Sequence, residues 1–199
     1  MDAALDVAIA TGPRPEPAPT RKLLPDAVMG MVLFVFTEAM LFAGLVSAHT
    51  IVRALASEWP PAGQPRLPFR ATMVNTAALL ASGAILAVAQ RTYRRRPSDA
   101  VGPMLLSLVF GAFFVLFQGR EWAALLAEGL TLTSSPYASF FYVIVGMHAL
   151  HAVAALGALG WAWLRLRAGR LSPAQLGAVA LLWYFVVLVW PVLYARVYL

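Results

Sequence analysis

Five long blocks of apolar residues, separated by short polar breaks, constrain this chain more than any other feature. A helix needs roughly 20 mostly apolar residues to cross about 30 Å of bilayer hydrocarbon. The blocks cover residues 28–50, 71–90, 101–117, 137–164 and 174–194. Backbone groups in hydrocarbon must be hydrogen-bonded internally, and the sequence lacks the alternating pattern of barrel strands. We therefore predict an all-α integral membrane protein, a bundle of five transmembrane helices.

Composition agrees with this class, because 61% of the residues are hydrophobic and only 12% are charged. A typical soluble domain carries about 25% charged residues, and so few charges cannot cover a water-facing surface. The chain has no cysteine, which excludes disulfides, thiolate metal sites and cysteine nucleophiles. Alternate prolines near the start predict a mobile polar arm over residues 1–27, followed by one transmembrane domain over 28–199.

The distribution of basic residues predicts the orientation of the bundle. The arm and the second and fourth loops hold ten lysines and arginines, whereas the first loop, the third loop and the C-terminus hold five. The positive-inside rule assigns the richer side to the cytoplasm, so we expect a cytoplasmic N-terminus and a periplasmic C-terminus. The net charge of +6 is thus a topology signal, and we expect no nucleic-acid partner.

Glu38 lies near the middle of the first predicted span. A carboxyl group at that depth is expensive and usually functional. It could be a proton-relay group, a polar anchor between helices, or a neutral acid hydrogen-bonded to a neighbour. His49 follows 11 residues later, about three turns on, and shares the face of Glu38 near the outer end. We interpret His49 as an interfacial histidine rather than a partner of Glu38.

His148 and His151 form an H-x-x-H pair in the middle of the fourth span. A spacing of three places both side chains on one face of a helix, where they could supply two metal ligands. A metal site normally needs three or four ligands, and no cysteine or nearby carboxylate is evident. We therefore favour polar packing or lipid contact, with a metal centre as the alternative.

Charged and aromatic residues also mark the edges of the membrane. Arg120, Glu121 and Trp122 fall in a predicted third loop, about 118–136, where we expect an interfacial salt bridge beside an aromatic anchor. Trp59 lies in the proline-rich first loop and also suits the interface.

Small and polar residues are expected to pack the helices together, as they commonly do in membrane bundles. The second and fourth spans carry such residues at Thr72, Asn75, Thr76, Ser82, Gly83, Gly146, Gly157 and Gly160.

Several motifs, in order from about residue 28 to the C-terminus, resemble subunit III of the haem-copper oxidases in its short bacterial five-helix form. The stretch 36–44 is similar to the family's Ser-Glu-x-x-x-Phe-x-Gly helix, and 146–151 to its Gly-Phe-His-Gly-Leu-His. Further resembling stretches are Trp59-Pro60-Pro61, 74–83, and Gln118 with Glu121-Trp122. The last span departs from the family pattern Trp-His-Phe-x-Asp-x-x-Trp, because Tyr184 and Val187 replace its His and Asp.

The resemblance implies a non-redox accessory subunit of a cytochrome c oxidase in a bacterial inner membrane. Such a subunit supports assembly, lipid binding and proton uptake, and it belongs to an enzyme only as part of the complex. Haem and copper would be in the partner subunits I and II, while this chain would bind phospholipids. The resemblance also assigns Glu38 as the buried carboxyl. It implies that the lipid- or cleft-adjacent residues are His148, His151, Trp59, Glu121 and Trp122.

Three alternatives stay open from the sequence. Within the same family, the chain could serve a quinol oxidase or a nitric-oxide-reductase-associated complex. From another class, it could be a small proton-coupled transporter with Glu38 as its proton site, although mid-span helix breaks are not evident. A stand-alone metalloenzyme would use His148 and His151 as ligands.

Overall fold

The computed structural model describes residues 24–65 and 67–198, so most of the predicted N-terminal arm lies outside the described residues. The described chain contains five long helices and no strand, which confirms the predicted fold class. The helices are α2 (Asp26–Leu55), α3 (Phe69–Arg95), α4 (Val101–Ala127), α5 (Pro136–Arg167) and α6 (Pro173–Leu193). A 3₁₀ turn, η1 (Pro97–Ala100), leads into α4, and a π-helical turn, η2 (Tyr194–Tyr198), follows α6. All five helices are long and apolar enough to cross a membrane.

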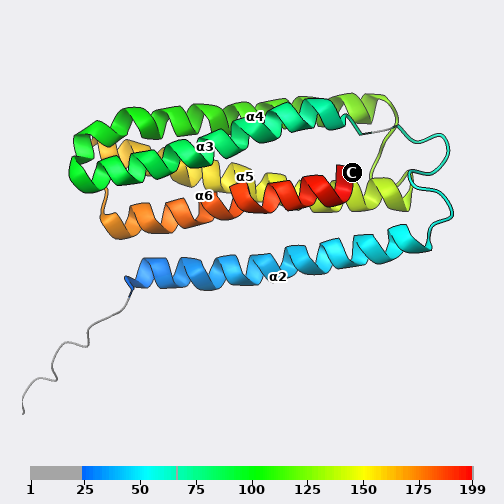
Figure 1. Ribbon diagram of the computed structural model, residues 1–199, viewed down its shortest axis with the longest axis horizontal. Helices are drawn as coiled ribbons and strands as arrows, with labels where there is room; N and C mark the ends of the chain where they lie inside the picture. The colour runs from blue at the N-terminus through cyan, green and yellow to red at the C-terminus, as the bar shows by residue number, and fades with distance from the viewer. Residues whose placement is uncertain (1–23, 66, 199) are drawn as a thin grey trace, which may run out of the picture.

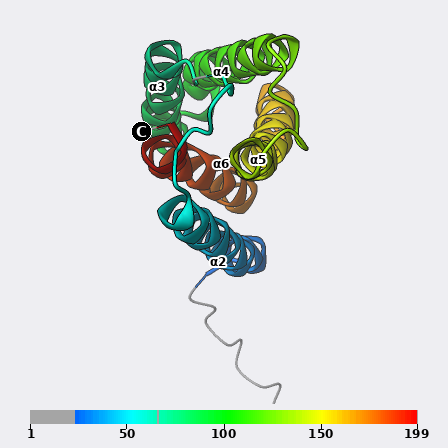
Figure 2. The same ribbon diagram turned by 90° about the vertical axis from the view of Figure 1, so that its right-hand side faces the viewer.

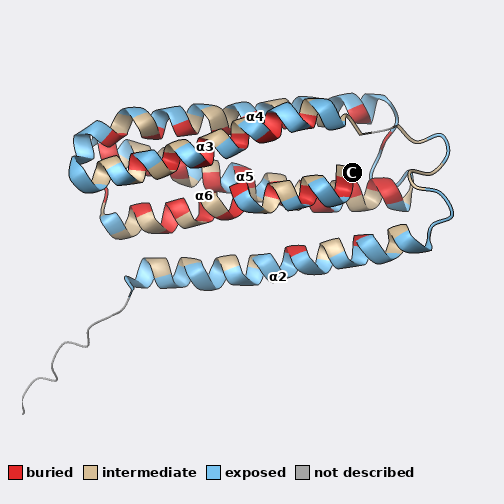
Figure 3. Cartoon of the chain, in the orientation of Figure 1, coloured by how far each residue is buried: buried red, intermediate tan, exposed pale blue. Residues whose placement is uncertain are grey.

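The helices run side by side along one long axis (Figure 1). Viewed along that axis, α3, α4, α5 and α6 surround a common interior, and α2 lies outside this group next to α6 (Figure 2). In the most apolar stretch of α6, 61% of the residues are buried, whereas in the corresponding stretch of α2 only 6% of the residues are buried. Figure 3 shows the same contrast, with α2 exposed over most of its surface. The helix α6 is therefore the most buried of the five spans, and α2 is the least buried.

Local sequence signals set the helix boundaries. The hydroxyl of Ser135 accepts a hydrogen bond from the backbone of Ala138 and caps α5, whose first residue is Pro136. Ser172 and Gln175 form a capping box at the start of α6. These are the residue types preferred at helix N-termini, because they satisfy free backbone N–H groups.

The third predicted span corresponds to α4, which is longer than predicted. It continues to Ala127 rather than ending near residue 117. No proline occurs between residues 117 and 127, and the chain turns only at Gly129, whose positive φ of 89° suits glycine. Ser135 and Pro136 then begin the next helix, α5. As a result Gln118, Glu121 and Trp122 lie on α4 and not in a loop.

The polar face of the second span packs inward as predicted, since Thr72, Asn75, Thr76, Ser82 and Gly83 are all buried. Gly157 does not fit the prediction for the fourth span. It is exposed, and a Cβ there would meet no atom within 4 Å.

A tight contact between helices involves Gly111 of α4, which the sequence analysis did not single out. A Cβ on Gly111 would lie 2.6 Å from the ring of Trp183 in α6. The indole N–H of Trp183 donates to the Ser82 hydroxyl at 3.2 Å, and the hydroxyls of Ser82 and Ser107 are 3.1 Å apart. This cluster joins α3, α4 and α6.

Candidate functional site

Glu38 of α2 and His151 of α5 meet near the middle of the two helices. Glu38 Oε2 lies 2.9 Å from His151 Nε2, and the side chains are 18% and 10% exposed. We refer to these two residues as the Glu38–His151 pair. It explains how a carboxyl group is accommodated at membrane depth, because a partner on another helix satisfies it.

The hydrogen bonds of His151 restrict where protons can reside. Its Nδ1 lies 2.7 Å from the carbonyl oxygen of Met147, and a carbonyl oxygen only accepts, so Nδ1 carries a hydrogen. Nε2 then has two options. It accepts a proton from a neutral Glu38 carboxyl, or it donates one to a Glu38 carboxylate. Both arrangements hold one shared proton between Glu38 and His151.

Aromatic rings surround the Glu38–His151 pair. Phe42 meets His151 edge-on with ring centroids 5.5 Å apart, and Phe185 of α6 lies 6.2 Å from the same imidazole. This apolar wall strengthens the electrostatic coupling between the carboxyl and the imidazole, because the local dielectric is low.

The sequence analysis identified both members of the pair but not their contact. Glu38 and His151 are each near the middle of a span. This position was the only sign in the sequence that the two residues lie at the same depth in the membrane. His49 makes no contact with the pair and is buried against Trp59 and Phe140 at 5.4 and 5.8 Å. Its position is thus in an aromatic cluster near the outer end of α2.

His148 does not act together with His151. Its ring stacks on Trp190 of α6 at 4.9 Å and meets Phe114 of α4 edge-on at 6.2 Å. Both histidines meet Phe42 of α2, at 6.3 and 5.5 Å, but only His151 is hydrogen-bonded to Glu38. In the part of the chain that the structure describes, no group of three His, Cys, Asp or Glu side chains is positioned to hold a metal ion.

A second polar cluster lies between α3, α4 and the end of the chain. The Asn75 amide donates to the Phe114 carbonyl at 3.2 Å and to Gln118 Oε1 at 3.3 Å. The Gln118 amide in turn donates to the Tyr198 hydroxyl at 3.1 Å. The sequence analysis missed this role of Gln118 because it assigned the residue to a loop.

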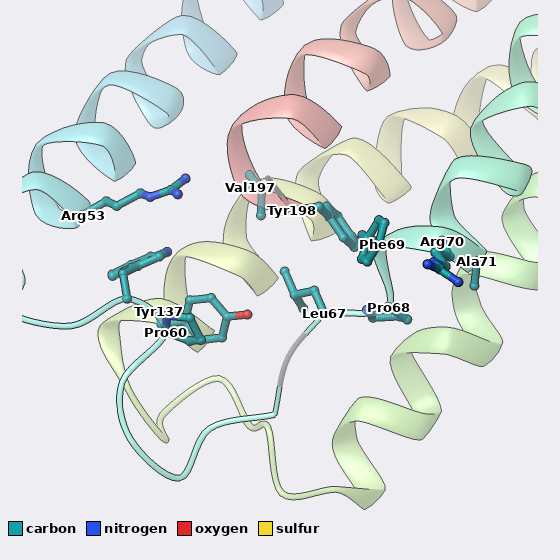
Figure 4. Close-up of a pocket in the computed structure, with 11 residues that line it drawn as sticks. Arg53, Pro60, Leu67, Pro68, Phe69, Arg70, Ala71, Tyr137, Val197 and Tyr198 are labelled. Atoms are coloured by element: carbon teal, nitrogen blue, oxygen red, sulfur yellow. The ribbon is translucent and has the colours of Figure 1, made fainter.

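Trp59 lies at the outer end of the bundle and lines a cavity of about 730 Å³ (Figure 4). Its ring meets Tyr137 edge-on at 5.2 Å. Arg53 extends from α2 toward Val197 and Tyr198 across this cavity. The first loop thereby folds back over the ends of α5 and α6.

The expected salt bridge beside Trp122 does not form, since the structure shows no ion pair between the described residues Arg120 and Glu121. Both residues belong to the extended part of α4, toward its outer end. Trp122 faces α5 instead and packs edge-on against Phe141 and Tyr142, at 6.4 and 6.0 Å. It is a helix-packing residue rather than a loop anchor.

A family model described as cytochrome c oxidase subunit III matches residues 20–199. The chain belongs to the cytochrome c oxidase subunit III family. It is 34% identical over 178 residues to a probable cytochrome c oxidase subunit 3 of Nocardia farcinica, covering 85% of this chain and 86% of that protein. It is 33% identical over 181 residues to cytochrome c oxidase subunit 3 of Synechocystis, covering 88% of this chain and 76% of the relative.

This chain is also 33% identical over 184 residues to cytochrome c oxidase subunit 3 of Lycodon semicarinatus, covering 85% of this chain and 67% of the relative.

The two departures from the subunit III pattern in the last span both contact α3. The Tyr184 hydroxyl donates to Gln90 Oε1 at 2.7 Å. A Cβ added at Gly83 would lie 2.9 Å from Val187 Cγ1, so this glycine gives Val187 its room. Tyr184 and Val187 thus link α6 to α3 through one hydrogen bond and one close apolar contact.

Replacing Glu38 with Leu should lower the free energy of unfolding by about 1–3 kcal/mol, because His151 Nε2 is left buried without a partner. The double variant Glu38→Leu/His151→Leu should recover part of this loss, since neither polar group then remains. Thermal unfolding of the detergent-solubilised protein measures both. Glu121→Leu is the control and should be nearly neutral. Additive losses in the double variant would show that the pair is not coupled.

Proposed function

We propose that this chain is a non-redox subunit of a cytochrome c oxidase, which supports assembly of the complex, lipid binding and proton uptake. Membership of the subunit III family makes it an accessory subunit of a haem-copper oxidase. The observation that carries the proposal is the match to that family over residues 20–199. In this proposal subunits I and II hold haem and copper, and they carry the electrons and reduce dioxygen.

The Glu38–His151 pair supports the proton-uptake part of the proposal. A proton shared between a carboxyl and an imidazole 2.9 Å apart can be passed to a third group, and its loss leaves two acceptors facing each other, which favours uptake of another proton. Glu38 lies on α2, the helix with the most exposed surface. Both side chains of the pair are themselves partly exposed. The pair is therefore accessible to a neighbouring subunit that packs against α2.

The proposed membrane is the bacterial inner membrane, with the end of α2 that carries Asp26 in the cytoplasm. The basic loops between α3 and α4 and between α5 and α6 lie at that same end of the bundle (Figure 1). Their excess of arginines supports this orientation through the positive-inside rule.

Because the chain has no cysteine, single cysteines can report the orientation directly. We expect Thr133→Cys, in the loop before α5, to react with a membrane-impermeant maleimide in intact spheroplasts. Ala168→Cys, in the loop before α6, should react only after the membrane is opened. The reverse pattern of labelling would invert the proposed orientation.

Affinity purification after gentle solubilisation of native membranes tests the proposed function. A haem-containing partner with oxygen-consuming activity should co-purify with the tagged chain. Oxidation of reduced cytochrome c supports the assignment, whereas oxidation of quinol alone would favour the quinol-oxidase alternative. Recovery of the chain without any haem protein would overturn the accessory role, and proton-coupled transport by that chain in liposomes would support a transporter.

Replacement of Glu38 by Gln tests the proton role within the purified complex. Gln retains a hydrogen-bonding side chain toward His151 but cannot share the proton. We expect the haem content to be unchanged, while the protons translocated per electron and the number of turnovers before inactivation both fall. Gln64→Glu, in the outer loop between α2 and α3, is the control. It also exchanges an amide and a carboxyl group, but at a position away from the Glu38–His151 pair. Unchanged pumping and durability in Glu38→Gln would refute the proton role.

A further inference from the structure

The cavity of about 730 Å³ at the outer end of the bundle is formed by segments that are far apart in the sequence (Figure 4). We call it the outer cavity. The end of α2, the first loop, the starts of α3 and α5, and the last residues of the chain all contribute to its lining. Its volume lies within the range of about 300–1,000 Å³ that is usual for ligand pockets. Neither member of the Glu38–His151 pair lines it, so it is a separate site.

The side chains around the outer cavity have the composition of a protein interface. More than half of the 11 lining residues are arginine or aromatic, namely Arg53, Trp59, Phe69, Arg70, Tyr137 and Tyr198. Within the described ranges 24–65 and 67–198, no lysine, aspartate or glutamate lines the cavity. Aromatic residues and arginine are enriched in interfaces, and lysine and the acidic residues are depleted there. Tryptophan, tyrosine and arginine also carry much of the binding energy, so the cavity is suited to a protein segment.

The outer cavity is positively charged on two opposite sides. Arg53 extends into it from the last turn of α2, and Arg70 stands across from it at the start of α3 (Figure 4). Arg53 Nη1 donates to the carbonyl oxygen of Arg196 at 3.5 Å, which directs the guanidinium over the cavity. A guanidinium has five N–H donors, so it can bind a carboxylate in addition to this contact. The charges therefore favour an occupant that is negatively charged.

The arginines of this cavity are placed against the topology signal. In the proposed orientation the outer side of the membrane holds only five lysines and arginines, and the positive-inside rule disfavours basic residues there. Three of the five, Arg53, Arg70 and Arg196, line the outer cavity or contact a residue that lines it. Their concentration at one place favours a common binding partner over a general surface charge.

An aromatic surface lies between the two guanidiniums. Trp59 and Tyr137 meet edge-on with ring centroids 5.2 Å apart. On the other side the Phe69 ring is 47% exposed, and the Arg70 guanidinium carbon lies 5.8 Å from its centroid. A fitting occupant is therefore an extended segment with an apolar side chain between acidic ones.

We propose that the outer cavity docks an acidic, extended segment of a neighbouring oxidase subunit on the outer side of the membrane. Carboxylates of this segment pair with Arg53 and Arg70, and an apolar side chain between them packs on Phe69 and Tyr137. A lipid headgroup with a single phosphate fits less well, because the two guanidiniums lie on opposite sides of an aromatic surface. This inference rests on the accessory function proposed above, which supplies the neighbouring subunit.

Photo-crosslinking from inside the outer cavity tests the inference. The photoreactive residue p-benzoylphenylalanine replaces Phe69 or, as a control, Leu126 near the outer end of α4, which is 51% exposed and does not line the cavity. The tagged complex is irradiated in native membranes, and the cross-linked peptides are identified by mass spectrometry. We expect the probe at Phe69 to join an outer segment of an oxidase subunit that carries Asp or Glu close to the cross-linked position. The probe at Leu126 should not join that segment.

Charge reversal in the same experiment tests the role of the arginines. Arg70→Glu should lower the yield of the cross-link about tenfold, because it replaces an attraction with a repulsion. Arg120→Glu makes the same change at an exposed outer position of α4 and should leave the yield unchanged.

An unchanged yield in Arg70→Glu would overturn the inference. So would the absence of a cross-link from Phe69, or cross-links only to phospholipid, only within this chain, or only to a segment without Asp or Glu. The haem content of each purified complex is measured in parallel. A complex with normal haem content but without the cross-link sinks the docking site alone, whereas a tagged chain that brings down no haem protein sinks the proposed function.

Discussion

Hydrogen bonds between buried side chains decide which helices of this bundle pack together. Lipid tails are as apolar as leucine, so burial of apolar surface gives one helix face little preference over another in a membrane. The Trp183 indole supplies that preference through its bond to Ser82, which also meets Ser107 of α4. The same ring fits closely over Gly111. This cluster joins α6 to α3 and α4, and both α2 and α5 also pack against α6.

The attachment of the outlying helix α2 also depends on a hydrogen bond between side chains, here between α2 and α5. Only Phe42 and His49 of α2 are fully buried, so its attachment rests on few contacts. The Glu38–His151 pair adds a polar link to α5, and Phe42 packs beside it against the same imidazole. Glu38, which helps to attach α2, is therefore also one of the two residues that hold the shared proton. Loss of that proton would leave two acceptors facing each other, which connects the proposed proton chemistry to helix packing.

The two histidines of the fourth span illustrate how one motif can serve two environments. His151 points to α2 and has hydrogen bonds at both ring nitrogens, to Met147 and to Glu38. His148, one turn earlier, stacks on Trp190 and meets Phe114. A helix surrounded by neighbours on several sides makes this separation possible, because a spacing of three residues still rotates the side chains by about 60°.

The sequence by itself determined the number and type of the helices and most of their boundaries. Hydropathy, helix caps such as Ser135 and Ser172, and the buried polar face of α3 are local properties, so they can be predicted without knowing any neighbour. Only the tertiary structure decided that Glu38 pairs with His151, that Gln118 and Trp122 belong to α4, and that Gly111 rather than Gly157 is a close-packing position. The physical reason is that each of these outcomes depends on which helix lies opposite. In an apolar solvent the apolar faces of a helix are nearly equivalent, and a few polar and small side chains select among them only when all five helices are assembled.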